Sequence, residues 1–190
     1  MHLSLGIHGS SSGGRQEFER RLRERPVRSA GPETAPAASI GADGLIGRIN
    51  IPRLGLSAVV FEGTDKLTLR RAVGHITSTS LPGQPGNVGL AGHRDSFFRP
   101  LKAIAKDDLI TVTTLNAEYR YRVASTRIVQ PTEVSVLLPD GGEVLTLVTC
   151  YPFNFVGPAP ERFIVRAKRM PASEERMPAI EPGLDGLHQQ

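Results

Sequence analysis

Hydrophobic positions fall into short runs from Gly44 onward, and turn-forming residues separate these runs. Val, Ile, Leu, Thr and Tyr dominate the runs, a composition typical of β-strands. Asn116-Ala117 lies between two of the runs and suggests a hairpin there. We predict strands over residues 45–51, 55–61, 87–92, 108–115, 118–129, 143–149 and 162–168.

The connections between these strands carry weaker helical signals. Thr64 is a residue type that caps helices, so we expect a short helix over TDKLTLRRA, residues 64–72. Residues 95–104 suggest a helical turn, and residues 131–138 suggest a short helix or strand. Seven or eight short strands with little helix favour an all-β sandwich or a closed barrel.

The two ends of the chain lack this pattern, so we divide it into three parts. Residues 1–43 are predicted as a flexible leader and linker, with a short charged helix over residues 15–25, because Gly, Ser, Pro and Ala dominate the rest. Residues 44–170 form the β domain, which is long enough to bury its own core. Residues 171–190 are polar and are predicted as a mobile tail.

Composition excludes several classes of protein. A single cysteine rules out an internal disulfide and a CxxC zinc ribbon, and metal-binding and phosphate-binding motifs are absent. We therefore expect no metal and no cofactor. The net charge is +4, but the Arg residues are scattered, aromatic residues make up 5% and Trp is absent. Nucleic-acid binding is therefore not expected.

Two residues at predicted strand ends could carry chemistry. Cys150 ends EVLTLVTC before a Pro-containing loop, a suitable place for a nucleophile, although a free Cys is more often a small buried hydrophobe. His93 follows the apolar run NVGLAG and could serve as a general acid or base, or be a structural histidine. His75 competes with it but lies in a looser Gly/Ser/Thr context.

Arg162 opens the last predicted strand. If residues 143–149 and 162–168 pair antiparallel, Cys150 and Arg162 meet at the same rim of the sheet. A guanidinium group is always charged and has several donors, so it can hold an oxyanion. The alternative is a surface arginine paired with Glu161 or Glu143.

Together these segments resemble one family. TLVTC (146–150) is similar to the TLxTC signature of sortases, the cysteine transpeptidases of bacterial cell surfaces. AGHR (91–94) and APERFIV (159–165) resemble the segments that carry the catalytic His and Arg of that family. The resemblance covers roughly residues 44–169 in family order, and CYPF with LPGQPGNVGLAGHRDSFFRPL looks most like class D sortases.

The resemblance implies an all-β fold, an eight-stranded sortase-type β-barrel with short helices in the connections. It assigns the nucleophile to Cys150, the acid to His93 and the oxyanion contact to Arg162, and leaves His75 structural or rim-lining. Thr149 is expected to hold the substrate backbone. A backbone N–H near Tyr151 is expected to be a second oxyanion donor.

The implied reaction is cleavage of an LPxTG-like or LPxTA-like sorting signal after Thr, through a thioacyl-enzyme. Transfer to an amine, from a peptidoglycan cross-bridge or a protein lysine, would attach surface proteins to the cell wall or to each other. Two alternatives remain: a cysteine peptidase that only hydrolyses, and a non-catalytic sortase-like binding barrel.

The resemblance also implies a location, the extracytoplasmic face of the bacterial cell membrane. Sortases usually begin with a transmembrane anchor, and this sequence contains neither an anchor nor a signal peptide. RQEFERRLRERP resembles the linker that follows such an anchor. We therefore expect the native form to be membrane-anchored.

Overall fold

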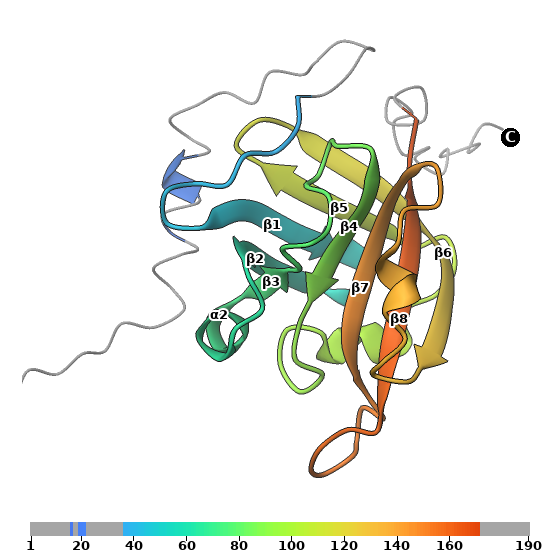
Figure 1. The fold of residues 1–190 in the computed structure, drawn as a ribbon. Coiled ribbons are helices and arrows are strands. Elements are labelled where there is room, and N and C mark those ends of the chain that lie inside the picture. The colour runs from blue at the N-terminus through green and yellow to red at the C-terminus, as the bar shows by residue number, and fades with distance from the viewer. Residues whose placement is uncertain (1–15, 17–18, 22–35, 172–190) are drawn as a thin grey trace, which may run out of the picture.

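Eight strands close into a barrel (Figure 1) in the computed structural model, which describes residue 16, residues 19–21 and residues 36–171. Around the barrel the order is β1-β2-β3-β4-β7-β8-β6-β5. Pairs β2–β3 and β4–β7 are parallel, and the other pairs are antiparallel. The strands are β1 (Leu45–Ile51), β2 (Leu56–Glu62), β3 (Val73–His75), β4 (Gly86–Ala91), β5 (Leu109–Thr114), β6 (Glu118–Val129), β7 (Glu143–Tyr151) and β8 (Glu161–Arg169). The predicted eight-stranded barrel is confirmed.

Short helices occupy the connections, as expected. They are η1 (Pro52–Leu54), α2 (Lys66–Arg71), η2 (Arg99–Ala103) and η3 (Val134–Leu137). The predicted cap of α2 is wrong, because Asp65 takes that position instead of Thr64. The Asp65 carboxylate accepts hydrogen bonds from the backbone N–H groups of Leu67 (2.9 Å) and Thr68 (3.1 Å). These N–H groups lie in the first turn, where a helix offers them no carbonyl partner.

One strand, β3, was not predicted. It has only three residues, and Gly74 at its centre contributes no hydrophobic side chain. A Cβ atom on Gly74 would lie 2.3 Å from the backbone oxygen of Gly63, so only glycine fits this approach. The strand forms because β2 and β4 flank it on both sides, a long-range contact that local composition does not reveal.

Alternating side chains from the strands fill the barrel interior. The core contains two tyrosines of β6, Tyr119 and Tyr121, which are both fully buried. Burial of its ring raises the pKa of Tyr121 well above the ordinary value. The large side chains in this core include Ile49, Ile51, Leu90, Phe98, Leu101, Ile110, Leu145 and Leu147. Each stabilises the fold by about 1.5–3 kcal/mol through burial.

The connection between β6 and β7 packs on the outer face of β4 and β7. The amide nitrogen of Asn87 donates to the carbonyl oxygens of Val136 (3.1 Å) and Leu138 (3.4 Å). The hydroxyl of Thr146 donates to the amide oxygen of Asn87 at 2.8 Å. Arg166 adds a bond to the Val136 carbonyl at 3.1 Å. This connection is therefore fixed beside the strand that leads to Cys150.

Part of the predicted linker packs against the barrel. Ala38 is buried, and its N–H donates to the carbonyl of Pro82 at 2.7 Å. The Tyr119 hydroxyl donates to the carbonyl of Pro36. Residues 16 and 19–21 are helical, in keeping with the predicted charged helix, but the rest of that segment lies outside the described residues. The boundaries at 43 and 170 stay predictions, and the tail beyond 171 also lies outside the described residues.

Candidate active site

Cys150 and Arg162 lie directly opposite each other on neighbouring strands. Strands β7 and β8 pair antiparallel, and their register matches Cys150 with Arg162. Directly opposed residues project from the same face of a sheet with Cβ atoms about 5 Å apart. The predicted antiparallel pairing, which brings these two residues to one rim, is therefore confirmed. Both residues are partly buried, and Cys150 is the chain's single cysteine.

His93 reaches the same rim from β4. The parallel pairing of β4 with β7 extends past its last strand residue, because the N–H of Gly92 donates to the Val148 carbonyl at 3.2 Å. The hydroxyl of Thr149 donates to the carbonyl of Gly92 at 2.8 Å. The residue before His93 is thus tied to the two residues before Cys150. The His93 side chain is exposed.

A buried aromatic ring anchors the turn that carries His93. Phe98 is fully buried, and its N–H donates to the His93 carbonyl at 3.1 Å. The ring lies so close to Gly92 that a Cβ atom there would be 2.8 Å from it. Chain reversal after β4 therefore needs glycine at this position and a large apolar side chain at position 98.

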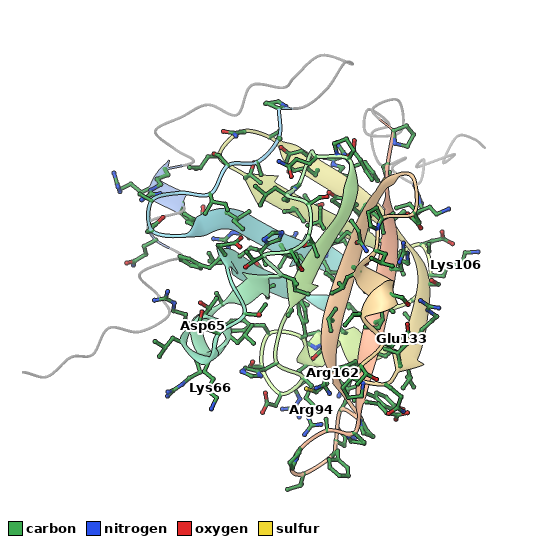
Figure 2. The ribbon with its side chains drawn as sticks, in the orientation of Figure 1. Asp65, Lys66, Arg94, Lys106, Glu133 and Arg162 are labelled. Carbon is green, nitrogen blue, oxygen red and sulfur yellow. The ribbon has the colours of Figure 1, made fainter. Side chains whose placement is uncertain are left out.

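Arg162 is held by backbone oxygens. Its Nη1 donates to the carbonyls of Glu161 (2.9 Å) and Ala159 (3.3 Å). Neither predicted alternative partner forms an ion pair with it in the described part of the chain, and Glu143 instead lies 3.5 Å from Arg169. Figure 2 shows Arg162 at the lower end of the barrel, near Arg94. Within the described residues, the other guanidinium donors of Arg162 form no hydrogen bond, so they can reach a bound group.

Thr149 and Tyr151 alternate with Cys150 along β7, so their side chains lie on the opposite face of the strand. Thr149 is buried and its hydroxyl is bonded to Gly92. The Tyr151 ring packs near Phe163, with centroids 6.3 Å apart. A substrate contact at Thr149 would have to come from the backbone, whereas the Tyr151 ring is only partly buried. The substrate-binding role of both residues stays a prediction.

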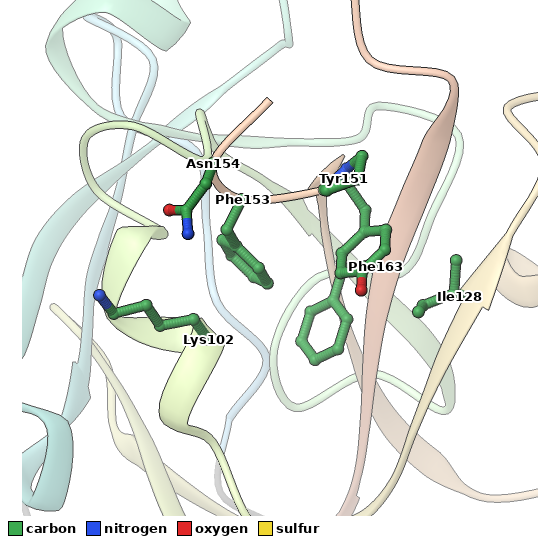
Figure 3. Close-up of a pocket in the computed structure, with 7 residues that line it drawn as sticks. Lys102, Ile128, Tyr151, Phe153, Asn154 and Phe163 are labelled. Carbon is green, nitrogen blue, oxygen red and sulfur yellow. The ribbon is translucent and has the colours of Figure 1, made fainter. Parts of the chain in front are cut away.

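An open pocket of about 420 Å³ lies next to this rim (Figure 3). Three aromatic rings make up much of its wall, with centroids 5.2 Å apart for Phe153 and Phe163 and 6.0 Å apart for Tyr151 and Phe153. Its lining residues are Lys102, Ile128, Tyr151, Pro152, Phe153, Asn154 and Phe163. This aromatic cluster was not predicted, although CYPFNF contains three aromatic residues within six.

His75 occupies a closed site of its own. It is 2% exposed, and its Nδ1 lies 2.6 Å from a carboxylate oxygen of Glu62. Its Nε2 lies 3.0 Å from the Ser80 carbonyl and 3.1 Å from the Thr79 hydroxyl. These contacts favour a structural role. Over the described residues, no group of three or more His, Cys, Asp or Glu side chains could hold a metal ion.

Comparison with known families identifies this arrangement. The family model that describes the sortase domain matches residues 49–170 of this sequence. The chain therefore belongs to the sortase family, and it is an enzyme of the cysteine transpeptidase class. Sortases act at the cell envelope; in the described part of this chain, no helix is long and apolar enough to cross a membrane.

A curated relative and a solved structure agree with the predicted likeness to class D, and a sortase A has the same fold. The chain is 35% identical over 140 residues to sortase D of Bacillus subtilis, covering 73% of this chain and 67% of that protein. A solved sortase D transpeptidase of Clostridium perfringens has a TM-score of 0.60 at 25% identity, covering 82% of this chain and 88% of that one. A solved sortase A of Actinomyces oris has a TM-score of 0.65 at 28% identity, and the match covers 80% of this chain and 98% of that one.

Proposed function

We propose that this sortase cleaves an LPxTG-like or LPxTA-like sorting signal after Thr and transfers the acyl group to an amine. The observation that carries the proposal is the register of three strands. Cys150 lies opposite Arg162, and the residue before His93 is bonded to Val148 and Thr149. A nucleophile, an acid and an oxyanion donor thus share one end of the barrel.

The first half-reaction forms a thioester. Cys150 attacks the Thr carbonyl carbon as a thiolate, with its proton transferred to His93. The resulting oxyanion accepts hydrogen bonds from Arg162 and from a backbone N–H near Tyr151. His93 donates a proton to the nitrogen of the leaving residue as the carbon–nitrogen bond breaks. The peptide up to Thr is then attached to the enzyme, and the released fragment carries a free amine.

The second half-reaction reverses these roles. An incoming amine attacks the thioester carbon, His93 accepts its proton, and the carbon–sulfur bond breaks to release Cys150. The acceptor is a peptidoglycan cross-bridge or a lysine of another protein, and the donors are surface proteins with a C-terminal sorting signal. The reaction takes place on the extracytoplasmic face of the membrane.

Intact-mass spectrometry tests this proposal. The protein is mixed with LPxTG and LPxTA peptides, with a peptide of scrambled order as control. A mass increase equal to the peptide up to Thr, lost in Cys150→Ala, is expected. Because Cys150 is the only cysteine, no second thiol can account for an adduct.

Three results would contradict the proposal. An adduct that persists in Cys150→Ala would exclude Cys150 as the nucleophile. An adduct that breaks down only to the free acid, at the same rate with and without added amines, would make the protein a hydrolase. The absence of any adduct, with Cys150 unreactive toward thiol reagents, would favour a non-catalytic barrel.

A further inference from the structure

Arg94, the residue after His93, joins the loop that follows β4 to the loop that follows β7. Its Nη1 donates to the carbonyl of Pro152 at 3.2 Å. Its Nη2 donates to the carbonyls of Phe155 (2.7 Å) and Gly157 (2.9 Å). The guanidinium carbon also lies 5.9 Å from the centre of the Phe155 ring, within range of a cation–π contact.

The loop that Arg94 binds has little burial of its own. Residues 154–158 are all exposed, and Val156 is 95% exposed. One internal bond, from the N–H of Phe155 to the Pro152 carbonyl at 3.3 Å, forms a turn. Within the described chain, the hydrogen bonds that tie residues 152–158 to other segments all come from Arg94. Apart from the Phe153 ring, which packs against Phe163, the contacts that fix this loop therefore come from one side chain.

This loop separates Cys150 from Arg162 in sequence. Ala159 near the end of this loop and Glu161 at the start of β8 supply the carbonyls that orient the Arg162 guanidinium. The geometry points to Arg94 as a positioning residue for the reaction: it fixes the β7–β8 loop so that Arg162 faces the carbonyl attacked by Cys150. This inference rests on the proposed function.

The contact requires arginine. Three carbonyl oxygens from Pro152, Phe155 and Gly157 converge on one side chain, and a planar guanidinium presents its donors in a fixed fork. A lysine ammonium is a compact charge on a flexible stem and cannot span the same three acceptors. The three acceptors are neutral carbonyls, so the contact fixes the backbone of the loop through hydrogen bonds and is not an ion pair.

The test compares Arg94→Ala and Arg94→Lys with Arg99→Ala, which removes an exposed arginine from η2 in the same connection. Rates of acyl-enzyme formation are measured against peptide concentration. A misplacement of about 1 Å can cost about 100-fold in rate. We expect kcat to fall by about 30–100-fold in Arg94→Ala and by about 10-fold in Arg94→Lys. KM of both Arg94 variants should stay within about 3-fold of the wild-type value. Arg99→Ala should have the wild-type kcat and KM.

Hydrogen exchange of the same proteins separates positioning from general stability. In Arg94→Ala, the amide of Phe155, which donates to Pro152 within the loop, should exchange at least about 10-fold faster, while the amides of β1 and β6 are unchanged. Unchanged exchange in the loop, or faster exchange throughout the barrel, would overturn the inference. A wild-type kcat in Arg94→Ala would also overturn it.

The wild-type reaction keeps the two proposals distinguishable. If the wild type forms an adduct and Arg94→Ala does so equally fast, only the role of Arg94 fails. If the wild type forms no adduct with any sorting peptide, the proposed function fails, and the exchange rates of the loop then decide whether Arg94 holds it.

Discussion

Replacement of Thr149 by Val tests the contact that joins the His93 segment to the Cys150 strand. The Thr149 side chain is buried, and its hydroxyl donates to the carbonyl of Gly92 at 2.8 Å. Valine has nearly the same shape but cannot donate, so the change removes the hydrogen bond without leaving a cavity. The carbonyl of Gly92 then loses a partner next to His93.

The magnitude follows from the cost of an unmade hydrogen bond. A buried bond contributes about 1 kcal/mol net, and leaving its partner unsatisfied raises the loss to about 1–3 kcal/mol. For a domain of this size, 1 kcal/mol corresponds to about 3–5 °C in Tm. We therefore expect Thr149→Val to lower Tm by about 5–10 °C. At 25 °C, where the variant is still folded, we expect kcat for acylation to fall by about 10-fold.

Thr149→Ser is the matched control, because it keeps the hydroxyl and removes only the methyl group. Loss of a buried methyl costs about 1 kcal/mol, so Ser should lower Tm by about 3–5 °C in calorimetry, no more than Val does. Their peptide kinetics should differ, since only Val releases the Gly92 carbonyl. The reasoning is refuted if Val keeps the wild-type kcat, or if Ser loses as much kcat as Val.

Three other substitutions probe the site and its support. Arg162→Lys keeps the charge but loses the fork, so we expect acylation to slow by about 100–1000-fold, and near-normal initial rates would exclude an oxyanion role. His75→Ala removes the contact with Glu62 and should cost about 2 kcal/mol in urea unfolding, while the acylation rate per folded molecule stays normal; a silent but folded variant would contradict the structural role. Asp108 accepts hydrogen bonds from Arg53, which lowers the pKa of Asp108 in the folded protein below its ordinary value. The stability that this carboxylate adds is therefore present above about pH 4 and lost on further acidification, so wild type and Asp108→Asn should converge at low pH; a constant gap from pH 7 to pH 2 would disprove this.

Local pattern predicts a strand well where the pattern is long. The bounds of β6 match the prediction. Buried residues alternate with more exposed ones at Tyr119, Tyr121 and Val123, and a clear turn precedes the strand. β3 has no such signal, because its three residues owe their conformation to neighbours on both sides. The cap of α2 was missed by one residue, since Thr64 and Asp65 are both good capping types and only the backbone geometry decides between them.

Proximity in the site is predictable only in part. Cys150 and Arg162 lie on successive strands of one hairpin, so antiparallel pairing alone brings them together. The contact of Gly92 with Thr149 joins two parallel strands that are distant in sequence, and an apolar run such as NVGLAG does not reveal its neighbour. Placement of His93 beside them came from the family resemblance. The role of Arg94 has no signal in the sequence. Its acceptors are backbone carbonyls, which every residue provides, so no partner side chain can be recognised.

The parallel pairing of β4 with β7 has a consequence for how the enzyme matures. Gly92 and Thr149 are 57 residues apart in sequence, and the chain between them includes two other strands of the barrel. Contacts of this range form slowly, because the entropy of closing a long loop must be overcome before the contact stabilises anything. Arg162 adds a further requirement, since β8 is the last strand to be synthesised. In a growing or partly folded chain, the Cys150 thiol therefore lacks His93 and Arg162 beside it. Reactivity toward a sorting signal should arise only when the barrel closes.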